Sequence, residues 1–190
     1  MVAVTDIQST ITLEKFLTLP ETKPASEYIN GKIEQKPMPQ GQHSIIQTTL
    51  STAINQIVKP QKVALALTEL RFTFAGRSLV PDISVFNWHR IPKNDKGKIA
   101  NRFETYPDWV IEILSPEQSA NQVIGKILFC INQGTQIGWL IDPEDESVMI
   151  FKSNQFPEIK SGEDILPVLE SLKDFELSAK DMFSWLNIED

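Results

Sequence analysis

Two short apolar segments each carry one acidic residue where a soluble protein usually has none. Residues 80–86 and 109–114 are rich in Val, Ile, Leu and aromatic side chains, with Asp82 and Glu112 near their centres. Strands this apolar are expected to be buried on both faces. A carboxylate buried alone either destabilises the fold or takes up a proton. Both acids therefore need partners.

Two explanations meet this need. A backbone donor or an arginine can satisfy each acid locally, and for either acid alone this explanation is preferred. Side chains alternate between the faces of a strand, and neighbouring strands lie roughly 5 Å apart. Asp82 and Glu112 can therefore bind one hard divalent cation if the strand register aligns them. For the two acids together with Lys126, we favour the metal.

Lys126 lies on the predicted helix that follows the second apolar strand. It is the only Lys or Arg between Arg102 and Lys152. Its position beside the apolar stripe of the helix allows two orientations. The side chain can extend to solvent, or it can lean over the sheet toward the acids.

The composition indicates one globular domain outside the membrane. A chain of 190 residues fits a single core, and no segment approaches the ~20 apolar residues of a membrane span. Residues 1–6 lack the pattern of a signal peptide. Cys130 is the single cysteine, so no internal disulfide can form. We expect a cytoplasmic protein.

The charge distribution is uneven. The net charge is −7, which argues against nucleic acid as a partner. Residues 59–102 nevertheless hold nine Lys or Arg against three acids, a balance of +6, which leaves −13 for the rest. This block is either an ordinary solvated surface or a contact for a polyanion. The best candidates for DNA contacts are Arg90, Lys93, Lys96, Lys98 and Arg102.

Periodicity and turn residues predict the order of elements. A capped helix over residues 12–17 precedes a hairpin at 26–37, whose Asn30-Gly31 pair suits a type I′ turn. The other predicted helices span residues 43–58 and 115–133, with shorter helices within 166–186. The predicted strands span residues 63–74, 79–86, 108–114, 137–141 and 148–151.

This order predicts an α/β (α+β) fold with a mixed sheet flanked by helices and an N-terminal hairpin. We expect one domain over residues 1–190: an arm at 1–25, a core at 26–151 and an acidic helical region at 152–190. No glycine-rich phosphate loop and no cysteine- or histidine-rich zinc spacing is present.

The Pro81-Asp82 pair, followed thirty residues later by Glu112, resembles the motif of PD-(D/E)xK restriction-endonuclease-like nucleases. More narrowly, the chain resembles the Uma-two family of proposed bacterial endonucleases between residues 27 and 151. The segments that carry this resemblance are residues 26–33, His43, residues 80–83, residues 107–116, Lys126 and residues 138–143. One position departs from the motif, because Leu114 stands where the superfamily has lysine.

The resemblance implies roles for individual residues. Asp82 and Glu112 would bind Mg²⁺ or Mn²⁺, with the Ile113 carbonyl as a third ligand. Lys126, in the place of the missing lysine, would orient or deprotonate the attacking water.

The remaining candidate residues allow more than one role. His43 and Gln47 would complete the site through water or phosphate contacts, or else His43 caps its helix and Gln47 is solvated. Glu27 is a further candidate acid. For Cys130, a place in the core is the better interpretation than a role as nucleophile.

Two functions remain open. The first is a metal-dependent endonuclease that hydrolyses phosphodiester bonds, with DNA as the substrate and a homodimer as an aid to weak DNA binding. The second is a catalytically inactive module of the same fold that binds DNA or protein. A structural dimer subunit is a weaker third class.

Overall fold

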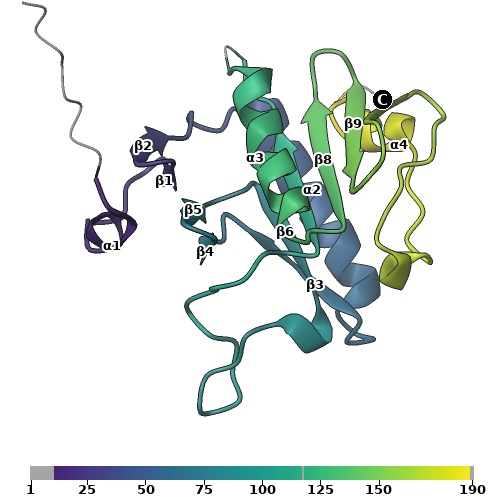
Figure 1. Cartoon of the computed structure of the whole chain (residues 1–190). Helices are drawn as coiled ribbons and strands as arrows, with labels where there is room; N and C mark the ends of the chain where they lie inside the picture. The colour runs from purple at the N-terminus through teal and green to yellow at the C-terminus, as the bar shows by residue number, and fades with distance from the viewer. Residues whose placement is uncertain (1–10, 117, 189–190) are drawn as a thin grey trace, which may run out of the picture.

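A six-stranded mixed sheet forms the centre of the computed structural model, which describes residues 11–116 and 118–188 (Figure 1). Three parts of the sequence predictions therefore lie outside the described residues: the first ten residues of the arm, Glu117 of the capping segment, and the last two residues of the acidic tail. The sheet has the strand order β10-β9-β8-β7-β6-β3, and β7 and β8 are its parallel pair. Its strands are β3 (Ala64–Thr68), β6 (Ile83–Asn87), β7 (Trp109–Ile113), β8 (Ile137–Asp142), β9 (Ser147–Lys152) and β10 (Glu158–Ser161).

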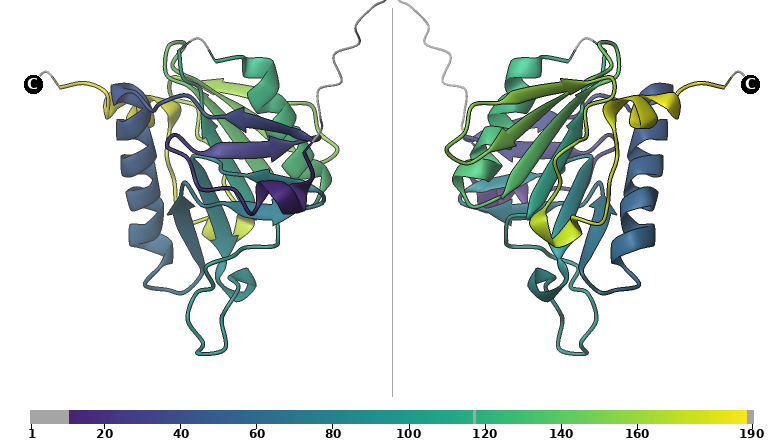
Figure 2. Two further views of the ribbon diagram at one scale, coloured as in Figure 1. Left: turned by 90° about the vertical axis from the view of Figure 1, so that its left-hand side faces the viewer. Right: turned by 90° about the vertical axis from the view of Figure 1, so that its right-hand side faces the viewer.

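Helices cover both faces of this sheet (Figure 2). On one face, α2 (Gly41–Val58) packs Ile46, Leu50 and Ile54 against the odd-numbered residues of β6 and β7, and α4 (Ala179–Ser184) joins the same apolar cluster. On the other face, α3 (Ala120–Asn132) packs against the even-numbered residues of β7 and β8. Every residue of β6 and β7 is buried. This confirms the double-sided burial that their apolar sequences predict.

Gly138 allows α3 to lie close to β8. A Cβ atom at this position would stand 2.3 Å from Cγ2 of Ile127. The missing side chain thus fixes the separation of helix and sheet.

A second, four-stranded sheet has the order β2-β1-β5-β4. It contains β1 (Ser26–Ile29), β2 (Lys32–Gln35), β4 (Phe72–Phe74) and β5 (Arg77–Leu79). Asn30 and Gly31 have φ angles of 51° and 83°, as the predicted tight turn between β1 and β2 requires. Before this hairpin, Thr12 caps the short helix α1 (Leu13–Phe16), and its side chain accepts a hydrogen bond from the Lys15 N–H.

Two of the predicted strands are wrong as continuous elements. The strand expected at residues 63–74 divides into β3 and β4, and the one at 79–86 divides into β5 and β6. The chain leaves the first at Glu69, which has a φ angle of 50°, and the second at Pro81, which lacks the N–H that a sheet needs. Each pair of fragments belongs to two different sheets. Asp82 therefore lies at the junction of the sheets rather than in the middle of a strand.

Three further boundaries differ from prediction. The helix expected from Ser115 begins at Ala120 with Ser119 as its N-cap, although Gln118 Oε1 still accepts the Ser115 N–H at 3.2 Å. The hydrogen bond of the predicted capping box thus forms ahead of the helix. The C-terminal region is helical at η2 (Glu170–Leu172) and α4, but it begins with β10. A 3-10 turn, η1 (Trp88–Arg90), interrupts the loop between β6 and β7.

Candidate active site

Asp82, the residue just before β6, lies opposite Glu112 of the neighbouring strand β7. Ile83 of β6 pairs with Ile111 of the antiparallel β7, and one further step of this register sets Asp82 opposite Glu112. Asp82 Oδ2 accepts a hydrogen bond from the N–H of Ile113 at 2.7 Å. The side chains of Asp82 and Glu112 are buried, with 2% and 3% of each residue exposed. The register thus brings the two predicted acids to one point.

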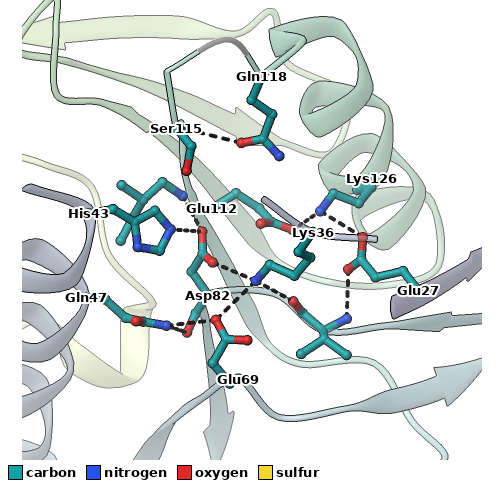
Figure 3. Close-up of polar contacts among 12 residues, drawn as sticks. Glu27, Lys36, His43, Gln47, Glu69, Asp82, Glu112, Ser115, Gln118 and Lys126 are labelled. Carbon is teal, nitrogen blue, oxygen red and sulfur yellow. Dashed lines mark hydrogen bonds and ion pairs between the residues drawn. The ribbon is translucent and has the colours of Figure 1, made fainter. Parts of the chain in front are cut away.

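Two cationic or protonatable groups surround the Asp82 carboxylate (Figure 3). Lys36 Nζ lies 2.7 Å from Oδ1, and His43 Nε2 lies 3.2 Å from Oδ2. Burial acts to raise the pKa of Asp82, but the hydrogen bond from His43 and the charge of Lys36 outweigh it and hold this pKa well below its ordinary range. Asp82 is therefore a carboxylate at neutral pH.

Glu112 has a different electrostatic environment. Its Oε1 lies 3.0 Å from Lys126 Nζ. Burial raises the pKa of Glu112 to about 7, because desolvation outweighs the attraction of Lys126, and the nearby Asp82 charge adds to the rise. Burial lowers the pKa of Lys126, but the charges of Glu112 and Glu27 prevail and hold it above its usual range. The Glu112 carboxyl can thus gain or lose a proton near neutral pH.

Glu27, on β1, links the hairpin to the segment before Asp82 and to α3. Its Oε1 accepts the N–H of Val80 at 2.8 Å, and its Oε2 accepts from Lys126 Nζ at 3.1 Å. It is 3% exposed. Glu27 therefore holds the segment that leads into Asp82 and, at the same time, the lysine beside Glu112.

The first turns of α2 supply the opposite wall. His43 is the third residue of α2, not its first, and its ring faces Asp82 rather than capping the helix. Within the described part of the chain, Nδ1 of His43 has no hydrogen-bond partner, so in the neutral ring Nε2 carries the proton toward Asp82. One turn on, Gln47 Nε2 donates to the Asp82 carbonyl at 2.9 Å and to Glu69 Oε1 at 3.1 Å.

Two hollows of about 430 Å³ each give access to the buried groups. One is lined by His43, Asp82 and Glu112, and the other by Glu27 and Lys126. The residues common to both are Lys36, Pro37 and Gln118. Lys36 and Pro37, on the chain that leaves β2, therefore border both hollows.

The family model for Uma2, described as "Putative restriction endonuclease", matches residues 13–180. The chain belongs to the Uma2 family. It is also similar to a "putative nuclease belonging to DUF820" from Anabaena variabilis ATCC 29413. The crystal structure of that protein superposes with a TM-score of 0.92 and 54% identity, over 93% of this chain and 99% of the other. A comparison with curated proteins finds no significant match.

These comparisons confirm the predicted family and the mixed α+β fold, and they support nuclease function in general.

The Uma2 protein has Leu114 where the wider superfamily has lysine. In the structure, Lys126 of α3 reaches Glu112 from the next helix. The orientation toward the acids is thus the one that Lys126 adopts.

Five of the residues proposed as catalytic gather at one point: Asp82, Glu112, Lys126, His43 and Gln47. Ile113 contributes its backbone N–H to Asp82 and lines the same hollow. Cys130 is buried, and burial raises its pKa, as expected of a core residue.

The predicted DNA-contact loop lies away from this cluster. It connects the end of β6 to the start of β7, whereas Asp82 precedes β6 and Glu112 lies near the end of β7. The loop therefore projects from the opposite end of these strands (Figure 1). Lys93, Lys96, Lys98 and Arg102 are exposed there.

Arg90 is held by the protein itself. Its Nη1 lies 2.8 Å from the buried Asp108 Oδ1, and its guanidinium stacks on Tyr106 at 4.4 Å from the ring centroid. Arg90 therefore has a structural role in this loop, and its contact with DNA stays a prediction.

Lys36 and Glu69 are polar neighbours that sequence reasoning missed. Lys36 Nζ contacts Asp82 and also lies 3.1 Å from Glu69 Oε1. Neither residue falls on a periodic pattern or on a motif, and Lys36 is 46 positions from Asp82. The packing of the hairpin against the sheet junction alone brings them into the site.

Proposed function

We propose that this Uma2 protein is a metal-dependent endonuclease that hydrolyses phosphodiester bonds in DNA. The observation that carries the proposal is the register of β6 and β7, which sets Asp82 and Glu112 opposite each other with Lys126 Nζ 3.0 Å from Glu112. Paired acids beside a lysine are the functional groups that metal-assisted hydrolysis of a phosphodiester requires.

The donor set fits Mg²⁺ or Mn²⁺. Among residues 11–116 and 118–188, no group of three or more His, Cys, Asp or Glu side chains is arranged to hold a metal ion by itself. Mg²⁺ uses one or two carboxylates and completes its shell with water and substrate phosphates. Asp82 and Glu112 would supply these carboxylates, and the Ile113 carbonyl is the proposed third protein ligand. With Glu112 ionised, the buried acids Glu27, Asp82 and Glu112 exceed the buried lysines Lys36 and Lys126 by one negative charge, which favours a cation.

When bound, the metal would polarise the scissile phosphate and acidify a water molecule. The chain's own residues would orient these groups. In the metal-free site the charges of Glu112 and Glu27 raise the pKa of Lys126, so the side chain is an ammonium there, and it would orient water or phosphate. Glu27 fixes Lys126 Nζ, and His43 and the Ile113 N–H fix the carboxylate of Asp82.

Cleavage of plasmid DNA with Mn²⁺ tests this proposal, with Glu112→Ala as the comparison. Wild-type protein should nick or linearise the plasmid, EDTA should stop it, and Glu112→Ala should be inactive. If wild-type protein binds DNA with metal present but does not cleave it, the inactive binding module becomes the better description. Leu114 at the superfamily's lysine position is the observation that favours that alternative.

The proposal also includes a cytoplasmic location and a homodimer that aids DNA binding. None of the described helices is long and apolar enough to cross a membrane. With a net charge of −7, one copy attracts DNA poorly, so a second copy would help by adding contacts.

A further inference from the structure

Lys36 occupies a position at the site that suits a metal ion. Its Nζ lies 2.7 Å from Asp82 Oδ1, 2.8 Å from the Val80 carbonyl oxygen and 3.1 Å from Glu69 Oε1. Figure 3 shows the ammonium in the middle of these oxygens, between Asp82 and Glu69. The Lys36 side chain is 8% exposed. An ammonium is thus enclosed by three oxygen atoms.

These atoms are the kinds of ligand that hard divalent cations select. Carboxylate and backbone carbonyl oxygens bind Mg²⁺ and Ca²⁺, and one of the carboxylates belongs to Asp82. A divalent cation bound to Asp82 Oδ1 would lie close to the Lys36 ammonium, which is 2.7 Å from the same oxygen. The two like charges repel strongly in a buried site, so binding of the metal there favours the departure of Lys36.

The structure also provides a place to which Lys36 can move. The residue lies on the segment between β2 and α2 and lines both hollows. Rotation of its four-carbon side chain can move the ammonium from Asp82 into the second hollow, on the side of Lys126, without unfolding an element.

We infer that Lys36 is a built-in counter-cation that neutralises the proposed metal ligand Asp82 in the resting site and is displaced from Asp82 when a divalent cation binds. This inference rests on the proposed function. It assigns Lys36 two positions: against Asp82 without metal, and in the second hollow with metal. Lys126 keeps its contact with Glu27 in both states.

Lysine labelling of the wild-type protein tests the displacement directly. The folded protein is treated with an acetylating reagent in EDTA or in saturating Mg²⁺, and modification of each lysine is measured by peptide mass spectrometry. Labelling of Lys36 should rise at least tenfold with Mg²⁺, whereas Lys23, an exposed lysine lining the same hollow, should label equally in both. Continued protection of Lys36 at metal saturation would overturn the inference.

Metal affinity provides the second measurement, by titration with Mn²⁺ of variants shown to be folded by circular dichroism. Removing the competitor in Lys36→Met should tighten Mn²⁺ binding at least tenfold. Lys126→Met deletes the same charge beside the other acid, and Lys23→Met deletes it at the surface. The gain should be clearly smaller in Lys126→Met and absent in Lys23→Met. If Mn²⁺ affinity rose equally in Lys36→Met and Lys126→Met, the loss of one positive charge would explain the effect, and displacement of Lys36 would be refuted.

The two experiments separate this inference from the proposed function. If wild-type protein binds the metal while Lys36 stays protected, the inference alone fails. If neither wild-type protein nor Lys36→Met binds Mn²⁺, the metal-dependent function fails and the inference with it. If only Lys36→Met binds, Lys36 blocks the metal instead of being displaced by it, and the inference is refuted.

Discussion

Asp82 accepts a 2.7 Å hydrogen bond from the backbone N–H of Ile113, the neighbour of Glu112 on the adjacent strand. This bond joins the two halves of the site, because it locks the carboxylate that precedes β6 to the end of β7. Lys36 and His43 then hold the same carboxylate from the hairpin segment and from α2. Asp82 thus connects β7, the hairpin segment and α2, in addition to being a candidate metal ligand.

Asp82→Asn should therefore destabilise the metal-free protein. Removing one partner from a buried charged cluster costs roughly 3–5 kcal/mol, and the lowered pKa of Asp82 shows that the folded state stabilises its charged form. Because this pKa is depressed, the stabilisation is present above the ordinary pKa of aspartate and is lost as the pH falls below it. Urea unfolding in EDTA measures the loss.

Metal gives the second half of this test. Mn²⁺ should raise the melting temperature of the wild-type protein by mass action, and Asp82→Asn should abolish the increase. A wild-type melting curve unchanged by millimolar Mn²⁺ would argue against the site.

The pH dependence of stability should reveal Glu112. Its pKa is raised to about 7 in the folded protein and is near 4.3 in an unfolded chain. The folded state therefore binds the extra proton, and its advantage is complete at low pH and is lost as the pH rises through about 7. The free energy of unfolding in EDTA should fall by roughly 1–3 kcal/mol across this window. Glu112→Gln should remove this dependence.

Metal binding should show the complementary trend. A proton on Glu112 competes with the cation, so Mn²⁺ affinity should rise as the pH increases toward 7 and level off above it. Isothermal titration calorimetry in buffers of different ionisation enthalpy would detect the released proton. The idea is wrong if affinity and proton release do not change with pH.

Lys126→Met should abolish DNA cleavage while Mn²⁺ still binds. Truncation removes the ammonium between Glu112 and Glu27, so folding should also lose roughly 3–5 kcal/mol, as for other broken buried pairs. Activity must be measured where unfolding curves show the variant to be native. Lys173→Met, at an exposed position, is the matched control and should change neither property. Wild-type turnover in Lys126→Met would show that another residue orients the water.

The basic loop should affect binding but not chemistry. Replacing Lys93, Lys96 and Lys98 together by glutamine should weaken DNA binding several-fold and flatten its salt dependence, since each phosphate contact releases counterions. The loop lies at the far end of β6 and β7 from the acids, so cleavage at saturating DNA should not change. Fluorescence anisotropy at several salt concentrations measures both affinity and slope. Unchanged values would exclude the loop from the interface.

Two glycines near α3 should respond oppositely to alanine. Gly138→Ala places a Cβ 2.3 Å from Ile127 Cγ2, and such overpacking costs roughly 1–3 kcal/mol. Gly125 lies within α3 with no atom within 4 Å of an added Cβ, so Gly125→Ala should stabilise by about 0.5–1 kcal/mol. Thermal melts of the two variants compare them directly. A stable Gly138→Ala would mean that α3 can shift away from β8.

Local features of the fold are readable in the sequence because they depend on a few neighbouring residues. Asn30 and Gly31 supply the positive φ angles of the hairpin turn, and Thr12 caps α1 with its own side chain. The spacing of Ile46, Leu50 and Ile54 specifies the buried face of α2. The apolar runs of β6 and β7 likewise reveal strands buried on both faces, and hence two acids in need of partners.

Tertiary structure decided which groups became those partners. Lys126 and Glu27 meet across 99 positions of the chain, and Lys36 reaches Asp82 only because the hairpin packs against the junction of the two sheets. The division of the predicted strands at Glu69 and Pro81 also depends on distant contacts. The two fragments of each predicted strand pair with different sheets, and these pairings involve strands far away in the sequence. Strand direction likewise sends the basic loop to the far end from the acids. Sequence patterns determine which side chains must be buried, but the partners of a buried charge depend on contacts between distant segments.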